Sequence, residues 1–117
     1  WELSTLGDPL ADLAYQLMAW QFPSEGGMVG LEGVDRAPLL IPSDEAYIES
    51  YCQRTGRADI DHWPFYMAFC FFRIAAILQG IKKRALIGTA SSAEADSRAV
   101  MVGPLAALGA GYIKQSA

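Results

Sequence analysis

Few side chains of this sequence have the types and spacings that chemistry requires. The only histidine, His62, stands just before an expected helix start, and one histidine without a paired nucleophile is a weak sign of catalysis. The two cysteines, Cys52 and Cys70, form no Cys-x-x-Cys or Cys/His grouping, which argues against a zinc or redox site. The sequence therefore predicts no catalytic and no metal-binding residue in this chain, and it leaves the substrate-binding residues unknown.

Two charged residues, Asp12 and Arg73, lie inside strongly apolar stretches. A guanidinium cannot shed its charge, so we expect Arg73 to be mostly buried and bonded to a carboxylate, with Asp12 favoured over Asp8. Two alternatives stay open. Asp12 could simply oppose the dipole of its helix, and Arg73 could pack its stem while its charged head reaches water.

The first helix is the best specified element. Asp8 as N-cap and Pro9 at the first helical position predict a helix over residues 9–21. This segment is apolar nearly all round, which is typical of a central, buried helix. The following stretch, 22–42, carries several glycines and prolines without a sustained period and predicts a long loop.

Three further helical segments are expected. A serine cap and a closing glycine predict a helix over 43–56, and the longest apolar run, 63–81, predicts a helix that continues to Leu86. A capping box at 91–94 opens the last helix. Because proline removes a backbone donor, Gly103-Pro104 should kink this helix or break it into segments of roughly 93–102 and 104–113.

No segment shows the alternation of a half-buried strand, so the predicted fold class is all-α. The 117 residues suffice for one small helical bundle, a single domain over 1–117. A formal charge of −4, with no dense basic cluster beyond Lys82-Lys83-Arg84, excludes the electrostatic footprint of a nucleic-acid-binding protein. Two buried free thiols would fit the reducing cytoplasm, so we expect a cytoplasmic location.

Four segments together resemble one known family. Trp1-Glu2-Leu3-Ser4-Thr5-Leu6-Gly7-Asp8-Pro9-Leu10-Ala11-Asp12-Leu13-Ala14 is similar to the segment that follows the metal-binding aspartate in aminoglycoside phosphotransferase and choline kinase-like proteins, in the branch found beside acyl-CoA dehydrogenase domains. The similarity extends to Ile41-Pro42-Ser43, Arg54-Thr55-Gly56-Arg57 and Phe72-Arg73-Ile74-Ala75-Ala76-Ile77-Leu78-Gln79-Gly80-Ile81. It therefore spans most of the chain.

This resemblance implies the C-terminal helical subdomain of a protein kinase-like fold, without the N-lobe and the catalytic loop. Phosphoryl transfer in such enzymes needs two aspartates and an asparagine around ATP and Mg²⁺, yet this sequence contains no asparagine. We expect no cofactor in this chain, ATP and Mg²⁺ in the intact parent, and no phosphate transfer by the chain alone. Glu2, Asp8, Asp12 and Arg73 would support the active site of the parent, although Glu2 could equally be an ordinary acid near a frayed terminus.

The expected partners are the missing N-terminal part of the parent and a small-molecule acceptor. Acceptors in this family include aminoglycosides, choline and other small hydroxyl compounds, and nothing in the sequence selects among them. We also expect the chain to form a homodimer, because the later helices cannot obviously enclose the apolar first helix. The predicted contact involves residues 1–6, 10–15 and the glycine-rich loop 26–33.

Two other functions are considered. A stand-alone helical interaction module would use the excess apolar surface, which reflects a hydrophobic content of 52%, to bind another protein. A membrane protein would use 63–81 as its spanning segment. Against the second stands Arg73 near the midpoint, at about 2.5–3.5 kcal/mol on insertion scales, so no membrane partner is expected.

Overall fold

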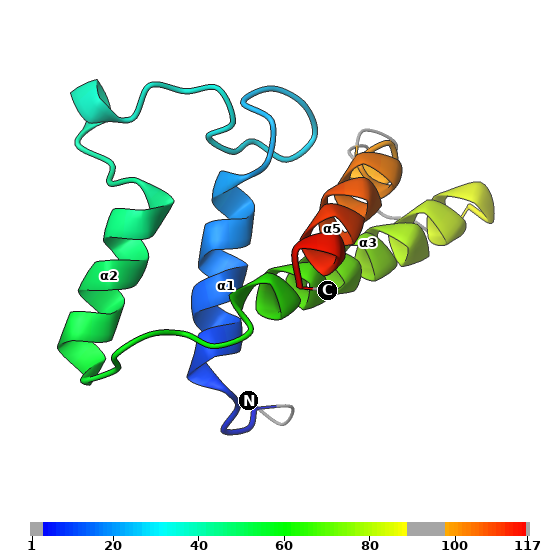
Figure 1. Ribbon diagram of the computed structural model, residues 1–117. Coiled ribbons are helices and arrows are strands. Elements are labelled where there is room, and N and C mark those ends of the chain that lie inside the picture. Colours follow the sequence, from blue (N-terminus) through cyan, green and yellow to red (C-terminus); the bar gives the residue numbers. More distant parts are fainter. Residues whose placement is uncertain (1–3, 89–97, 117) are drawn as a thin grey trace.

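The structure, a computed structural model, describes residues 4–88 and 98–116. These residues form the α-helices α1 (Pro9–Trp20), α2 (Asp44–Thr55), α3 (Trp63–Leu86) and α5 (Val102–Ser116), with a 3₁₀ turn η1 (Ala37–Leu39). Within the described ranges the chain has no strand, only one isolated bridge between Pro23 and Glu32, so the all-α prediction is confirmed. Figure 1 shows α5 lying along α3, with α1 between α2 and this pair.

The helix ends follow from local chemistry, as the sequence predicts. Asp8 Oδ1 accepts a hydrogen bond of 2.9 Å from the amide of Leu10, and Ser43 Oγ accepts one of 3.1 Å from the amide of Ala46. Each bond satisfies a first-turn amide that has no acceptor within its own helix. Gly56, with a φ of 72°, closes α2 in the left-handed conformation that glycine adopts most easily.

The core lies where α3 packs against α1 and α5. Phe71 is fully buried at its centre, with Phe22 packed edge-on at 6.4 Å between ring centroids and Tyr112 stacked at 5.7 Å. The cysteines Cys52 and Cys70 are both buried and free, as predicted. Burial raises the pKa of the Cys70 thiol, which keeps this residue protonated and unreactive at neutral pH.

The chain after α1 folds back onto the end of that helix. The amides of Gly30, Leu31 and Glu32 donate to the carbonyls of Pro23, Trp20 and Phe22 at 2.8–3.1 Å. These bonds pair carbonyls that the end of α1 and the following turn leave open. The long connection between α1 and α2 is therefore anchored to the core at its first half.

The break in the C-terminal region lies earlier than predicted. Residues 98–99 are helical, the chain turns at Val100 and Met101, and α5 begins at Val102. Pro104 therefore occupies the first turn of α5, where a missing amide costs little because amides there lack an intrahelical acceptor. The predicted cap at 91–94 lies outside the described residues.

Among the described residues, α3 is long and apolar enough to cross a membrane by length and composition. Only 39% of its most apolar window is buried within the structure. One face of the helix nevertheless packs against α1 and α5. Its buried residues are Met67, Cys70, Phe71, Ile74 and Leu78. The core helix of a soluble domain passes the same length and composition test, so this finding is weak support for the membrane alternative.

Candidate functional site

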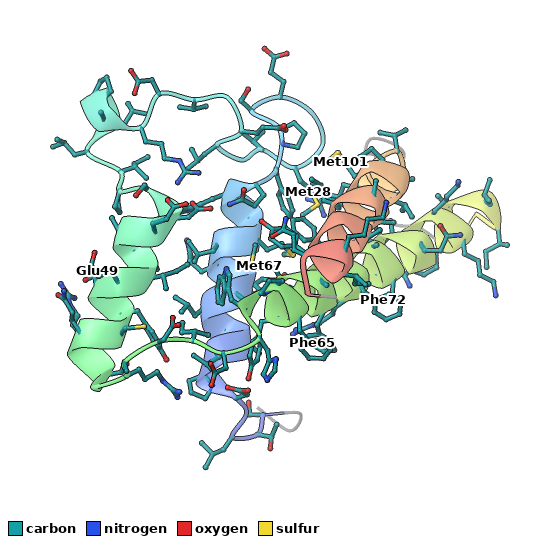
Figure 2. The ribbon with its side chains drawn as sticks, viewed as in Figure 1. Met28, Glu49, Phe65, Met67, Phe72 and Met101 are labelled. Carbon is teal, nitrogen blue, oxygen red and sulfur yellow. The ribbon has the colours of Figure 1, made fainter. Side chains whose placement is uncertain are left out.

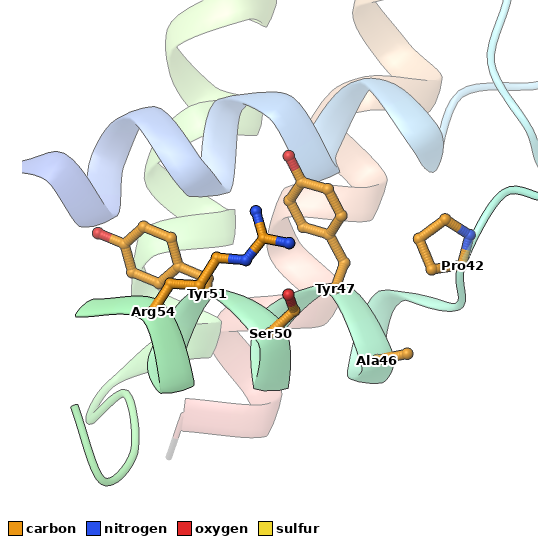
Figure 3. Close-up of a pocket in the computed structure, with 6 residues that line it drawn as sticks. All are labelled: Pro42, Ala46, Tyr47, Ser50, Tyr51 and Arg54. Atoms are coloured by element: carbon orange, nitrogen blue, oxygen red, sulfur yellow. The ribbon is translucent and has the colours of Figure 1, made fainter. Parts of the chain in front are cut away.

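An open pocket of about 380 Å³ lies on α2 and on Pro42, two residues before the helix begins (Figure 3). Six residues line it: Pro42, Ala46, Tyr47, Ser50, Tyr51 and Arg54. Residues three, four and seven apart share one face of a helix, which is why one short helix supplies nearly the whole lining. Figure 3 shows the side chains of Tyr47, Tyr51 and Arg54 on the side of α2 that faces α1.

The lining combines hydrogen-bonding groups with apolar ring surface. Arg54 is exposed and carries five N–H donors, while Tyr47, Ser50 and Tyr51 are half-buried and can each donate or accept through a hydroxyl. Such a set can bind a small molecule that has hydroxyl or anionic groups and some apolar surface. None of the six lining residues is a carboxylate, a histidine or a cysteine.

The pocket is held in place by a cluster around Asp44, at the start of α2. Its carboxylate accepts hydrogen bonds from Gln21 Nε2 at 2.5 Å and from the Arg36 guanidinium at 2.6 Å. The same guanidinium lies over the Trp20 ring at 5.1 Å, and Trp20 packs edge-on against Tyr47 at 5.0 Å. These contacts tie α2 to the end of α1 and fix the Tyr47 ring in the pocket wall.

No substrate-binding residue was predicted from the sequence, so this pocket was not expected. Ala46, Tyr47, Tyr51 and Cys52 have the spacing of an apolar helix stripe, a pattern that predicts packing rather than ligand binding. The available signal was Arg54, which continues that stripe at the next turn with a fixed charge. An arginine in line with two tyrosines indicates a surface built for polar contact as well as packing.

Of the four predicted supporting residues, Glu2 lies outside the described residues, and Asp8 makes a contact that the sequence did not predict. The hydroxyl of Tyr66, on α3, donates to Asp8 Oδ2 at 2.6 Å. The Tyr66 bond is the largest cause of a lowered pKa of Asp8, and the bond from the Leu10 amide is the second. The Tyr66–Asp8 bond also raises the pKa of Tyr66. Asp8 therefore joins the start of α1 to the first turns of α3.

Replacing Tyr66 by phenylalanine is expected to weaken the dependence of stability on acid pH. The folded state holds the pKa of Asp8 below its unfolded value of about 3.9, so its stabilising effect is complete above that pH and is lost as the pH falls through the folded pKa. Urea unfolding of both proteins between about pH 2 and pH 6 measures this slope. Identical slopes would mean that the Tyr66 bond does not act on Asp8 in solution.

The prediction for Arg73 is wrong. Both Arg73 and Asp12 are exposed, and among the described residues no ion pair joins Arg73 to Asp12 or Asp8. The guanidinium instead lies over the ring of Tyr15, 5.3 Å from its centroid. The charge of Arg73 therefore stays in contact with water, while the plane of its guanidinium group covers the Tyr15 ring on α1.

We therefore expect Arg73→Met and Asp12→Asn to act independently. An exposed cation–π contact is worth about 0.5–1 kcal/mol, so Arg73→Met should cost no more than that in unfolding free energy. The double variant should lose the sum of the two single losses within about 0.5 kcal/mol. A coupling energy clearly above that value, measured by denaturant unfolding of all four proteins, would place the two side chains in direct contact.

The described residues contain no group of three His, Cys, Asp or Glu side chains that could hold a metal ion.

The scan against family models finds none that matches this chain. Individual proteins do match. Acyl-CoA dehydrogenase family member 10 of Mus musculus is 50% identical over 92% of this chain, and family member 11 of Homo sapiens is 37% identical over 93% of it. The chain spans only 10% and 14% of the length of these two relatives.

A solved structure matches over nearly the whole chain. It is a crystal structure of a protein from Ralstonia eutropha that carries the provisional description aminoglycoside phosphotransferase. Sequence identity is 48%, the TM-score is 0.87, and the match covers 98% of this chain and 35% of that one. This chain is homologous to part of that phosphotransferase-like protein. The helical fragment expected from the four sequence segments is thereby confirmed, while the activity of the whole protein is a separate question.

Proposed function

We propose that this chain forms the helical part of a phosphotransferase that uses ATP and Mg²⁺ to phosphorylate a hydroxyl group of a small molecule. The observation that carries the proposal is the structural match with the Ralstonia eutropha protein, at a TM-score of 0.87 and 48% identity. The match covers 98% of this chain. The likeness therefore concerns this chain as a whole and not one motif.

In this proposal the chain supports chemistry that other residues perform. The α1–α3 core provides a rigid base, and the pocket of Tyr47, Tyr51 and Arg54 contributes to the surface that the acceptor molecule meets. The acid–base and metal-binding residues come from the part of the phosphotransferase outside the matched region. The two buried free thiols support a cytoplasmic location for the enzyme.

The test is a chimeric protein in which this chain replaces the matched region of the Ralstonia eutropha protein. It is assayed for ATP-dependent phosphorylation of a panel of small hydroxyl compounds, beside the unchanged parent and this chain alone. We expect turnover by the chimera and none by the chain alone. Loss of turnover in a folded chimera, under conditions where the parent is active, would contradict the proposal.

Arg54→Ala in the chimera then tests the pocket. We expect a raised KM for the acceptor with an unchanged KM for ATP, because the pocket would touch only the acceptor. Gln53→Ala, one residue earlier on a different face of α2, is the matched control and should change neither constant.

A further inference from the structure

Helix α2 is attached to the rest of the chain by few buried side chains. Of its twelve residues only Cys52 is buried, whereas α1 buries five of twelve and α3 buries seven of 24. Tyr47, Ile48 and Tyr51 pack against the core but stay half-buried. Figure 2 shows Glu49 on the other side of α2, pointing away from α1. An element with so few buried apolar contacts opens more easily than the core that it covers.

The polar contacts that hold α2 are concentrated at its first turn. The Asp44 carboxylate accepts hydrogen bonds from Gln21, at the end of α1, and from Arg36, in the connection between α1 and α2. Further along α2, the side-chain hydrogen bonds that the structure describes, from Gln53 and Thr55, stay within the helix. We call the contacts of Asp44 with Gln21 and Arg36 the Asp44 latch.

The other end of α2 has the features of a hinge. Gly56 has a φ of 72°, and a Cβ added there would meet nothing within 4 Å. Residues 56–59 are exposed, and the next buried residue is Ile60. A backbone rotation in 56–59 would therefore move α2, which is about 18 Å long, without disturbing α3. Residues 33–43, which follow the bonds of the amides at 30–32, leave slack for this motion.

We propose that α2 is a lid that pivots about residues 56–59 and is held closed by the Asp44 latch. In the closed state Tyr47, Tyr51 and Arg54 lie on the side of α2 that faces α1 (Figure 3). When the latch opens, α2 moves away from α1 and carries the whole pocket lining with it, because every lining residue belongs to α2 or is Pro42. This motion is a property of the chain itself and does not require the proposed phosphotransferase activity.

The two buried free cysteines can report this motion, because Cys52 lies on α2 and Cys70 on α3. The native chain is alkylated with iodoacetamide, and peptide mass spectrometry gives the rate at each cysteine. Each rate is divided by the rate at the same cysteine in the urea-unfolded chain. We expect the normalised rate to be higher at Cys52, because opening of the lid exposes it, whereas Cys70 is fully buried in the core and is exposed only when the core opens.

Arg36→Met tests the latch, because it removes a partner of Asp44 without changing α2 itself. It should raise the normalised rate at Cys52 roughly tenfold, the effect of losing a hydrogen bond to a charged group, and leave the rate at Cys70 unchanged. Gln21→Ala, which removes the other partner, should act in the same direction. Glu45→Gln is the matched control and should change neither rate, because it removes the next carboxylate of α2, which makes no ion pair among the described residues.

Three results would overturn the proposal. Equal rates at Cys52 in the Arg36→Met and Glu45→Gln chains would mean that the Asp44 latch does not control access to Cys52. A rise at both cysteines in Arg36→Met would mean that α2 opens only together with the core. A normalised rate at Cys52 as low as that at Cys70 would mean the same. None of these results would bear on the proposed phosphotransferase function.

Discussion

Replacing Phe71 by alanine is expected to lower the free energy of unfolding by about 3–5 kcal/mol. The ring is fully buried between Phe22 and Tyr112, and α5 approaches it so closely that a Cβ added at Gly109 would lie 3.1 Å from the Cβ of Phe71. Truncation would leave a cavity between α3 and α5 that neither helix can close by a small shift. Denaturant unfolding followed by tryptophan fluorescence measures the loss.

Phe72→Ala is the matched control, because it removes the same ring from the next position of the same helix. Phe72 is 71% exposed, so its truncation should change stability by no more than about 0.5 kcal/mol. A comparable loss for both variants would mean that α3 is rotated about its axis relative to the structure described.

Gly30→Ala is expected to cost about 3 kcal/mol, although it adds a single methyl group. A Cβ at this position would lie 2.5 Å from the carbonyl oxygens of Ala19 and Phe22, closer than real Cβ atoms approach backbone. Relief would require the loop to leave α1 and to give up the amide bonds of residues 30–32, each worth about 1 kcal/mol.

The comparison variant for Gly30 is Gly111→Ala, within α5, where an added Cβ meets nothing within 4 Å. Alanine there should be neutral or stabilising by about 0.5–1 kcal/mol, because it restricts the unfolded chain. If Gly30→Ala proved as harmless as Gly111→Ala, the loop would not contact α1 as described.

The predicted homodimer contact depends on how much of α1 is exposed. The expectation was that α1 keeps an uncovered apolar side, yet Leu13 is 7% exposed and Ala14 is fully buried. Leu6 and Tyr15 are nevertheless exposed, at 101% and 41%. Pairing of two copies through residues 1–6, the exposed edge of 10–15 and the loop 26–33 stays a prediction.

The helix ends, which depend on residues within one turn, could be predicted from the sequence. The features that depend on how α3 is rotated about its own axis could not. Asp8, Ser43 and Gly56 act within one helical turn, so their types alone define the ends of α1 and α2. The apolar residues of α3 run nearly all round the helix, so the sequence does not distinguish buried Phe71 from exposed Phe72. The location of Arg73 depends on the same rotation, as does the Tyr66 contact with Asp8.

The pocket on α2 was missed for a related reason. Tyrosine occurs both in protein cores and on binding surfaces. Only the position of α2 relative to α1 leaves Tyr47 and Tyr51 half-buried. That position depends on the contacts of Asp44 with Gln21 and Arg36, which join residues up to 23 positions apart. No local pattern predicts such a cluster.

The central claim is that this chain is an integral part of an ATP-using phosphotransferase domain. The most direct measurement is thermal unfolding of the Ralstonia eutropha chimera, of its unchanged parent and of this chain alone, each with and without Mg-ATP. We predict one cooperative transition for the chimera and a rise in its midpoint with Mg-ATP like that of the parent, since a ligand at 100 times its Kd stabilises by about 2.7 kcal/mol. The chain alone should not respond. Two independent transitions in the chimera, or no response to Mg-ATP where the parent responds, would contradict the claim.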